Sequence, residues 1–244
     1  MSKGINMYRK ILAALLISTF FATNVFAENW TCNLYALGSN RQKLVLKGVR
    51  KDTVVDGKVA QTNVTFTDPD GKVQTTEDLW YDGNGVLSKY EMKEFQDNEH
   101  GSIEVKDGRA YFSYTKEGKI RTDDEDFKPN AVIGPTTIGY VLKNWKTIMA
   151  GDDVDVRFGV MDRLETVGFK FFKIKEEKDG DQDVVVVKMK PTSIFIASLV
   201  DPLIFRFDKA GTKVLSIIGR TLPKQLIDGK WKDLDAESVY EYTN

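Results

Sequence analysis

The stretch DVDVRFGV, residues 153–160, alternates between polar and apolar side chains. Its apolar side chains would share one face of an extended strand: Val154, Val156, Phe158 and Val160. One apolar face and one polar face is the pattern of a strand in an antiparallel sheet that is covered on one side and wet on the other. The same period of two recurs in residues 183–190 and 203–207. These stretches predict a mainly β protein.

Turn signals separate such stretches along most of the chain. Asp-Gly and Asn-Gly pairs favour two-residue hairpin turns, because their residues accept a positive φ. The spacing therefore predicts a curved antiparallel sheet, either a half-barrel or an open barrel meander. The predicted turns are Asp56–Gly57, Asp68–Gly71, Asp82–Gly85, Asp107–Gly108, Glu117–Gly118, Asp179–Gly180 and Lys209–Gly211.

One stretch of the predicted sheet is apolar on both faces. Phe169 and Phe171 fall on one face of a strand, whereas Phe172 and Ile174 fall on the other. Two alternatives fit this pattern: the strand is buried on both sides, or a β-bulge switches its register.

Residues 137–150 follow a helical period instead. Pro135 precedes this stretch near a first turn, and Gly151 follows it as a stop signal. We expect one main helix that lies across the apolar face of the sheet. The side chains that recur at helical spacing are Ile138, Val141, Leu142, Trp145, Ile148 and Met149.

The longest apolar run of the chain after its first residues is SIFIASLVDPLIFRF, residues 193–207. It is too short for a membrane span, and Asp201-Pro202 divides it. The part before Pro202 is predicted to be a short second apolar element that plugs the sheet, and the part after it a strand. Two interpretations stay open: the run packs in the core, or it forms a wall of a hydrophobic cavity.

The first 27 residues have the pattern of a secretory signal peptide. Lys3, Arg9 and Lys10 precede an apolar stretch, and Val25-Phe26-Ala27 resembles a cleavage site. We expect cleavage after Ala27, a periplasmic location, no stable membrane span after cleavage, and one β-rich domain over residues 28–244. The only cysteine, Cys32, cannot form a disulfide within the chain, so the fold must depend on its hydrophobic core.

The charge balance excludes some partners. Without the three basic residues of the signal peptide, 32 Lys and Arg face 36 Asp and Glu. A nucleic-acid-binding protein needs a basic field, so we expect no nucleic acid as a partner. The acidic balance also argues against simple electrostatic docking on anionic lipid.

Catalytic and metal-binding patterns are weak. The only histidine, His100, lies in a polar stretch predicted to be an exposed turn, without a nucleophile motif nearby. The acidic run 123–126 is typical of a solvated loop. Residues 179–190 resemble the start of a calcium loop, but Val184 and Lys190 replace its glycine and its glutamate. We therefore predict no enzyme, no cofactor and no metal.

The stretch Pro135–Lys173, joined by Pro191–Asp208, carries a resemblance to a family of uncharacterised exported bacterial proteins. The segments that carry it are Asn144-Trp145, Ala150-Gly151-Asp152, Val156–Val160 and Arg163–Phe169. The order of elements also resembles the half-barrel of periplasmic lipoprotein carriers of the LolA/LolB type. That resemblance implies helices over an apolar cavity for acyl chains. It supplies no catalytic motif and no site residue.

The function predicted from these observations is non-enzymatic binding of an apolar ligand, a lipid or an acyl chain, in a half-barrel cavity. The alternative is a periplasmic structural or adaptor protein with a packed core and no small ligand. The sequence identifies no protein partner. The residues predicted to line the cavity are Trp145, Phe158, Phe169, Phe195, Ile196, Leu203 and Phe205.

Overall fold

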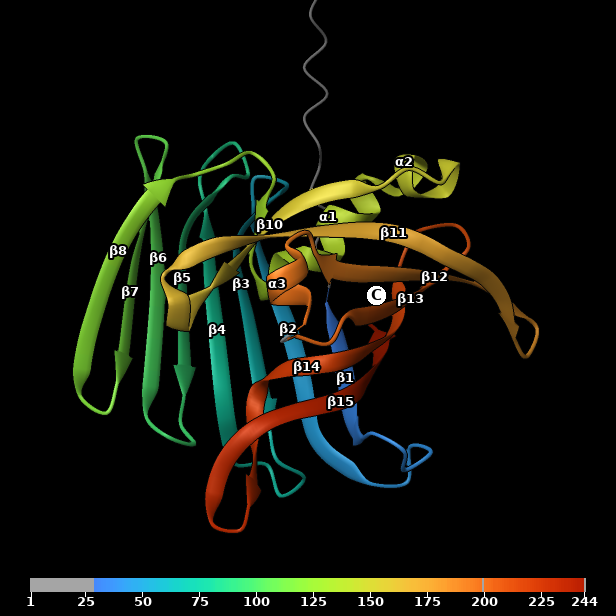
Figure 1. Cartoon of the computed structure of the whole chain (residues 1–244), viewed down its shortest axis with the longest axis horizontal. Coiled ribbons are helices and arrows are strands. Elements are labelled where there is room, and N and C mark those ends of the chain that lie inside the picture. Colours follow the sequence, from blue (N-terminus) through green and yellow to red (C-terminus); the bar gives the residue numbers. More distant parts are fainter. Residues whose placement is uncertain (1–28, 199, 244) are drawn as a thin grey trace, which may run out of the picture.

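The computed structural model describes residues 29–198 and 200–243. Fifteen strands form one open, strongly curved sheet in the order β8-β7-β6-β5-β4-β3-β2-β1-β15-β14-β13-β12-β11-β10-β9 (Figure 1). Neighbouring strands pair antiparallel, except for β9 and β10, which pair parallel. The mainly β, curved antiparallel architecture predicted from the alternating stretches is confirmed. The predicted signal peptide lies outside the described residues.

The strands are β1 (Trp30–Ala36), β2 (Leu44–Val55), β3 (Lys58–Thr67), β4 (Val73–Tyr81), β5 (Leu87–Glu94), β6 (Glu99–Lys106), β7 (Arg109–Lys116), β8 (Lys119–Asp126), β9 (Ala131–Val132), β10 (Val154–Val160), β11 (Glu165–Asp179), β12 (Gln182–Pro191), β13 (Leu203–Asp208), β14 (Val214–Ile227) and β15 (Lys230–Tyr242). The helices are α1 (Thr137–Lys143), α2 (Trp145–Ala150) and α3 (Ile194–Ala197), with 3-10 turns at Gly134–Thr136 and Met161–Arg163.

All seven predicted turns connect neighbouring strands of the sheet. In the turn between β2 and β3, Asp56 and Gly57 have φ values of 50° and 74°. Two consecutive positive φ values fit the right-handed twist of the flanking strands, which explains the recurring Asp-Gly pairs. The bulge predicted as one alternative for β11 is present, because its register against β12 shifts between Lys173 and Lys175.

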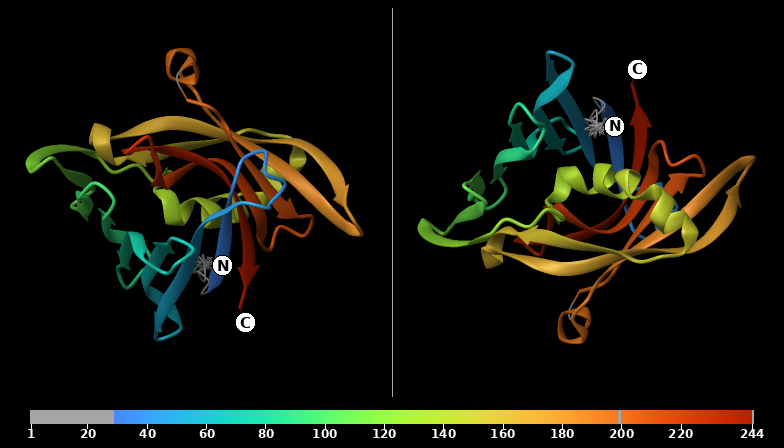
Figure 2. Two further views of the ribbon diagram at one scale, coloured as in Figure 1. Left: turned by 90° about the horizontal axis from the view of Figure 1, so that it is seen from below. Right: turned by 90° about the horizontal axis from the view of Figure 1, so that it is seen from above.

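Helices α1 and α2 lie inside the curve of the sheet, against its concave face (Figure 2). Their buried side chains Ile138, Val141 and Ile148 belong to the largest core cluster. The one helix expected over residues 137–150 is broken at Asn144, whose side-chain amide donates to the carbonyl of Tyr140 at 2.8 Å. An amide that bonds the local backbone competes with helical hydrogen bonding, so the periodicity overstated the length of the helix.

Helix α3 leaves the sheet on the face opposite to α1 and α2 and projects away from it (Figure 2). None of its residues is buried, and Ile194 is 90% exposed. The structure differs here from the expectation that this element plugs the sheet. The physical reason is that α1 and α2 already fill the concave face, whereas the connection from β12 to β13 runs on the convex side.

Two polar stretches form strands where turns or loops were expected. His100 lies in β6, exposed and paired with Lys93 and Thr115, so its assignment to a turn is wrong. The acidic run 123–126 belongs to the edge strand β8 and is largely exposed to solvent. Charged side chains on an edge strand discourage pairing with other chains. His100 and most of the acidic run occupy strand positions that face water, whereas the neighbouring Glu99 is buried.

Cys32 lies buried in a third core cluster, formed mainly by β1, β2 and β15. Burial raises the pKa of its thiol to about 12, although a hydrogen bond with the backbone of Gly48 acts in the other direction. The thiolate is therefore scarce at neutral pH, and Cys32 is a packing residue. No helix in the described part of the chain is both long and apolar enough to cross a bilayer.

Candidate functional site

Five of the seven predicted cavity residues lie together in the largest core cluster. Phe205 is buried, and Trp145, Phe158, Phe169 and Leu203 are half-buried around that cluster. Their rings contact other rings, as for Phe158 and Phe169, whose centroids are 5.9 Å apart. The structure therefore brings these five residues into one packed region that includes α1 and α2. The other two, Phe195 and Ile196, lie apart from it in α3.

Two hollows of the described chain are lined by residues other than these seven. An enclosed cavity between β6, β7 and β9 has a volume of about 10 Å³, room for about one water molecule. A larger hollow of about 420 Å³ opens to solvent beside Asn29, Trp30 and Arg50. Helices α1 and α2 pack against the concave face, the side of the sheet on which the sequence predicts the acyl cavity.

The most exposed apolar side chains of the described chain are found at α3. Ile194 and Phe195 are 90% and 75% exposed, and Val200 is 41% exposed. We call Ser193–Ser198 together with Val200 the apolar segment. Single exposed apolar residues are common, but adjacent large ones on a projecting element mark an interaction site.

The apolar segment has a defined base on the sheet. The backbone N–H of Thr192 donates to the carbonyl of Gly168 on β11 at 3.0 Å, and its hydroxyl donates to the same carbonyl at 3.2 Å. At the first turn of α3, the hydroxyl of Ser193 accepts a hydrogen bond from the backbone N–H of Ile196. The apolar side chains are therefore presented on a short capped helix.

Lysines surround the base of the apolar segment. On β12, Val187 and Met189 face the core, so Lys188 and Lys190 project from the convex face, the face that α3 leaves. Opposite Lys190 on β11 lies Lys170. We call Lys170, Lys188 and Lys190 the lysine face. The ammonium groups of Lys170 and Lys190 lie 5.8 and 5.2 Å from the ring centre of Phe172, which stands between them.

Only part of the lysine face is neutralised within the chain. Lys170 forms an ion pair with Asp153, the residue before β10. Among residues 29–198 and 200–243, Lys188 and Lys190 form no ion pair. Two further acidic groups lie on neighbouring elements: Asp155, opposite Lys170 on β10, and Asp201, which follows the apolar segment and acts electrostatically on Arg220.

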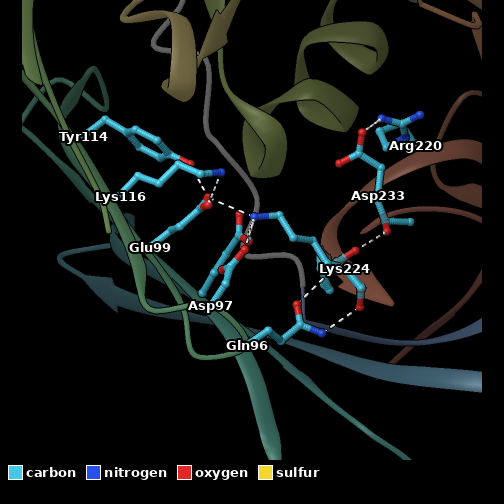
Figure 3. Close-up of polar contacts among 11 residues, drawn as sticks. Gln96, Asp97, Glu99, Tyr114, Lys116, Arg220, Lys224 and Asp233 are labelled. Atoms are coloured by element: carbon cyan, nitrogen blue, oxygen red, sulfur yellow. Dashed lines mark hydrogen bonds and ion pairs between the residues drawn. The ribbon is translucent and has the colours of Figure 1, made fainter. Parts of the chain in front are cut away.

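A second charged region, the acid–lysine cluster, joins the two halves of the sheet (Figure 3). The ammonium of Lys224 on β14 lies 2.8 Å from Glu94, 2.5 Å from Asp97 and 2.9 Å from Glu99. Tyr114 donates a hydrogen bond to Glu99. Sequence analysis did not find this cluster, because Lys224 lies more than a hundred residues from the three acids and no local pattern relates them.

The cluster shifts the pKa values of its carboxyl groups in opposite directions. Burial raises the pKa of Glu94 to about 7, although Lys224 acts against this. Burial also disfavours the charge of Glu99, but hydrogen bonds with Lys116, Lys224 and Tyr114 outweigh it and lower its pKa to about 2. Burial disfavours the charge of Lys224 as well, yet its three acidic partners raise its pKa.

The three carboxylates approach one another closely enough for a metal site, within 4.8 Å. The ammonium of Lys224, however, occupies the space that a cation would take between them. The side chain of Gln96 adds two hydrogen bonds with the backbone of Lys224, at 2.8 Å to its N–H and 2.6 Å to its carbonyl. The cluster therefore holds the β5–β6 turn and β14 together.

A buried polar network holds the start of the helical region on the sheet. The guanidinium of Arg50 donates to the carbonyl of Pro135 at 3.0 Å and pairs with Asp52 at 3.0 Å. Nearby, Tyr90 donates to Glu77 at 2.8 Å, and burial raises the pKa of Glu77 to about 7. These groups find partners inside the chain, and they fasten the turn before α1.

No family model matches the chain, and no curated protein matches it. Among solved structures, it is similar to a β-barrel-like protein of the domain of unknown function DUF1849 from Brucella abortus, with 12% identity, a TM-score of 0.47, and coverage of 89% of this chain and 94% of that one. It is also similar to a DUF1329 family protein from Desulfovibrio piger, with 11% identity, a TM-score of 0.27, and coverage of 89% and 83%. At these values the similarity does not bear on function.

Proposed function

We propose that this protein is a non-enzymatic lipid-binding protein that contacts a lipid surface through its apolar segment. The observation that carries the proposal is the exposure of Ile194 and Phe195 on a helix that projects from the convex face (Figure 2). Burial of such side chains in acyl chains gains about 1.5–3 kcal/mol each. This site lies on the convex side of the sheet, whereas the half-barrel cavity predicted from the sequence lies on the concave side, against which α1 and α2 pack.

The charged groups inside the protein support a binding function over a catalytic one. A catalytic acid or base needs access to a substrate, and the unusual carboxyl groups Glu94 and Glu77 are both buried. Glu94 is matched by Lys224, and Glu77 accepts a hydrogen bond from Tyr90. Each of these groups has a structural role that accounts for its position.

A structural or adaptor protein is the second candidate. The packed concave face favours a protein without a small ligand. In that case the apolar segment inserts into a groove of another protein instead of a lipid surface. The two functions share the segment and differ in what it binds, so the same variants distinguish them.

The proposed function belongs outside the cytoplasm. The support is the signal-peptide pattern of residues 1–27, with a cleavage site after Ala27. N-terminal sequencing of the protein from its native host is expected to begin at Glu28. A mature protein that begins at Met1 contradicts the periplasmic proposal.

Co-sedimentation with phospholipid vesicles tests the lipid-binding proposal. The double variant Ile194→Ser/Phe195→Ser removes the exposed apolar side chains, so we expect its affinity for vesicles to fall at least about 10-fold. The matched control is Val54→Ser/Val55→Ser, two adjacent residues that are 47% and 54% exposed at the other end of the fold. The control should bind as the unchanged protein does. If the unchanged protein sediments with neither neutral nor anionic vesicles, the proposal is wrong.

A further inference from the structure

We infer that the lipid surface that this protein recognises is anionic, and that Lys188 and Lys190 select it. The inference rests on the proposed function, since it names the headgroup chemistry at the same site. Its basis is that the burial pattern of β12 places the lysine face on the side of the sheet from which α3 projects (Figure 2). The occupant it specifies is the surface of a bilayer that contains phosphate-bearing lipids with a net negative charge.

The order of chemical groups along this side matches the depth profile of a bilayer. The apolar side chains Ile194 and Phe195 project furthest, on α3, and the lysines lie on the strand from which α3 departs. Lys190 and Ile194 are four positions apart in the chain, so their Cα atoms are at most about 14 Å apart. When the apolar side chains reach the acyl region, the ammonium groups are near the shallower phosphates, as in interfacial amphipathic elements.

The two lysines are available for this contact. Neither pairs with an acidic group within the described residues, and Lys190 lies over the ring of Phe172. A lysine stem can extend across an aromatic surface while its ammonium stays in water or at a phosphate. Lys170, the third member of the lysine face, is already paired with Asp153 and contributes less.

The acidic groups on this side limit the attraction without abolishing it. Asp155 lies on β10, two strands away from Lys188 and Lys190. Asp201 lies at the far end of the apolar segment, where it acts on Arg220. The overall acidic balance of the chain argues against docking through net charge alone. A local pair of lysines beside an apolar anchor needs no net positive charge, because screening limits surface charges to about 10 Å.

The decisive experiment compares neutral phosphatidylcholine vesicles with vesicles that contain phosphatidylglycerol, at about 0.1 M salt, where screening limits surface charges to about 10 Å. The unchanged protein should bind the anionic vesicles about 10- to 30-fold more tightly, since each lysine near such a surface contributes about a factor of five. The variant Lys188→Gln/Lys190→Gln should lose this preference while it keeps the affinity for neutral vesicles. The matched control Lys230→Gln/Lys232→Gln removes two lysines with the same spacing from the exposed start of β15 and should keep the preference.

The outcomes separate this inference from the proposed function. Equal binding to both vesicles, lost in Ile194→Ser/Phe195→Ser, overturns the anionic selectivity and keeps lipid binding. An equal loss of preference in both lysine variants also overturns it, because net charge then explains the effect. Binding to neither vesicle overturns both proposals. Self-association that depends on Phe195, measured by analytical ultracentrifugation, identifies a second copy of the chain as the occupant and overturns both as well.

Discussion

In the acid–lysine cluster the charged groups meet partners inside the chain, whereas in the apolar segment the large side chains meet almost none. Lys224 forms ion pairs with three acidic side chains that lie far away in the sequence. Ile194 and Phe195 project into solvent from the convex face. The presence of buried polar groups with partners inside the chain is explained by their contribution to stability. Exposed apolar groups have no such explanation, and for this reason the segment, and not the cluster, is the candidate site.

The largest effect that separates the two regions is expected for Lys224→Ala. The substitution leaves Glu94 and Glu99 buried without their central cation, and breaking such a pair costs about 3–5 kcal/mol. Urea unfolding should show this decrease in the free energy of unfolding. The control is Lys230→Ala, at an exposed position, with a change of less than about 0.5 kcal/mol. Similar changes in the free energy of unfolding for both variants would mean that the cluster does not hold the β5–β6 turn and β14 together.

A smaller effect, on the pH dependence of stability, is expected for Glu94→Gln. Because the pKa of Glu94 is raised from 4.5 to about 7, the folded protein binds a proton in that range that the unfolded chain has released. The free energy of unfolding therefore increases as pH falls from about 8 to about 5. We expect a difference of roughly 1–3 kcal/mol in the unchanged protein and a smaller difference in Glu94→Gln.

Two other carboxyl groups contribute to the same dependence of the free energy of unfolding on pH. Burial raises the pKa of Glu77 to about 7 as well, so part of the pH dependence persists in Glu94→Gln. Glu99 acts in the opposite sense: its pKa is lowered to about 2, so its contribution to stability is lost as pH falls below about 4.5. The control is Glu91→Gln, on the same strand, where an exposed lysine pairs with the carboxylate. An unaltered slope in Glu94→Gln contradicts the assignment.

The structural features that depend on neighbouring residues in the chain could be predicted from the sequence. Asp56 and Gly57 determine their turn through local φ preferences, and Gly151 ends α2 with a φ of 95° as expected. The break at Asn144 is also local, but helical periodicity does not register an amide that bonds its own backbone. Both interpretations of the apolar run at residues 193–207, core packing or a cavity wall, place it on the covered side of the sheet, because hydrophobicity does not tell on which face of a sheet a connection runs.

The features that could not be predicted from the sequence depend on contacts between residues far apart in the chain or on the side of the sheet where an element lies. Lys224 and Glu94 are brought together only by the curvature of the whole sheet, and no spacing between them has a meaning in the sequence. Likewise, Lys188 and Lys190 matched the polar face of a predicted strand, as most surface lysines do. Their position beside Ile194 depends on the side of the sheet from which α3 projects, and the sequence does not specify that side. Of the seven predicted site residues, only Phe195 and Ile196 lie in the site proposed now.

The smallest effect on stability is expected in the apolar segment, where the largest effect on binding is expected. Ile194→Ser/Phe195→Ser removes side chains that are 90% and 75% exposed, so little buried apolar area is lost. The free energy of unfolding should change by less than about 0.5 kcal/mol, as for surface substitutions elsewhere. The comparison variant is Phe205→Ala, in the core, with an expected loss of about 3–5 kcal/mol. If the serine variant is destabilised as strongly as the core variant, the segment packs against the protein in solution, and its projection from the convex face no longer supports a binding role.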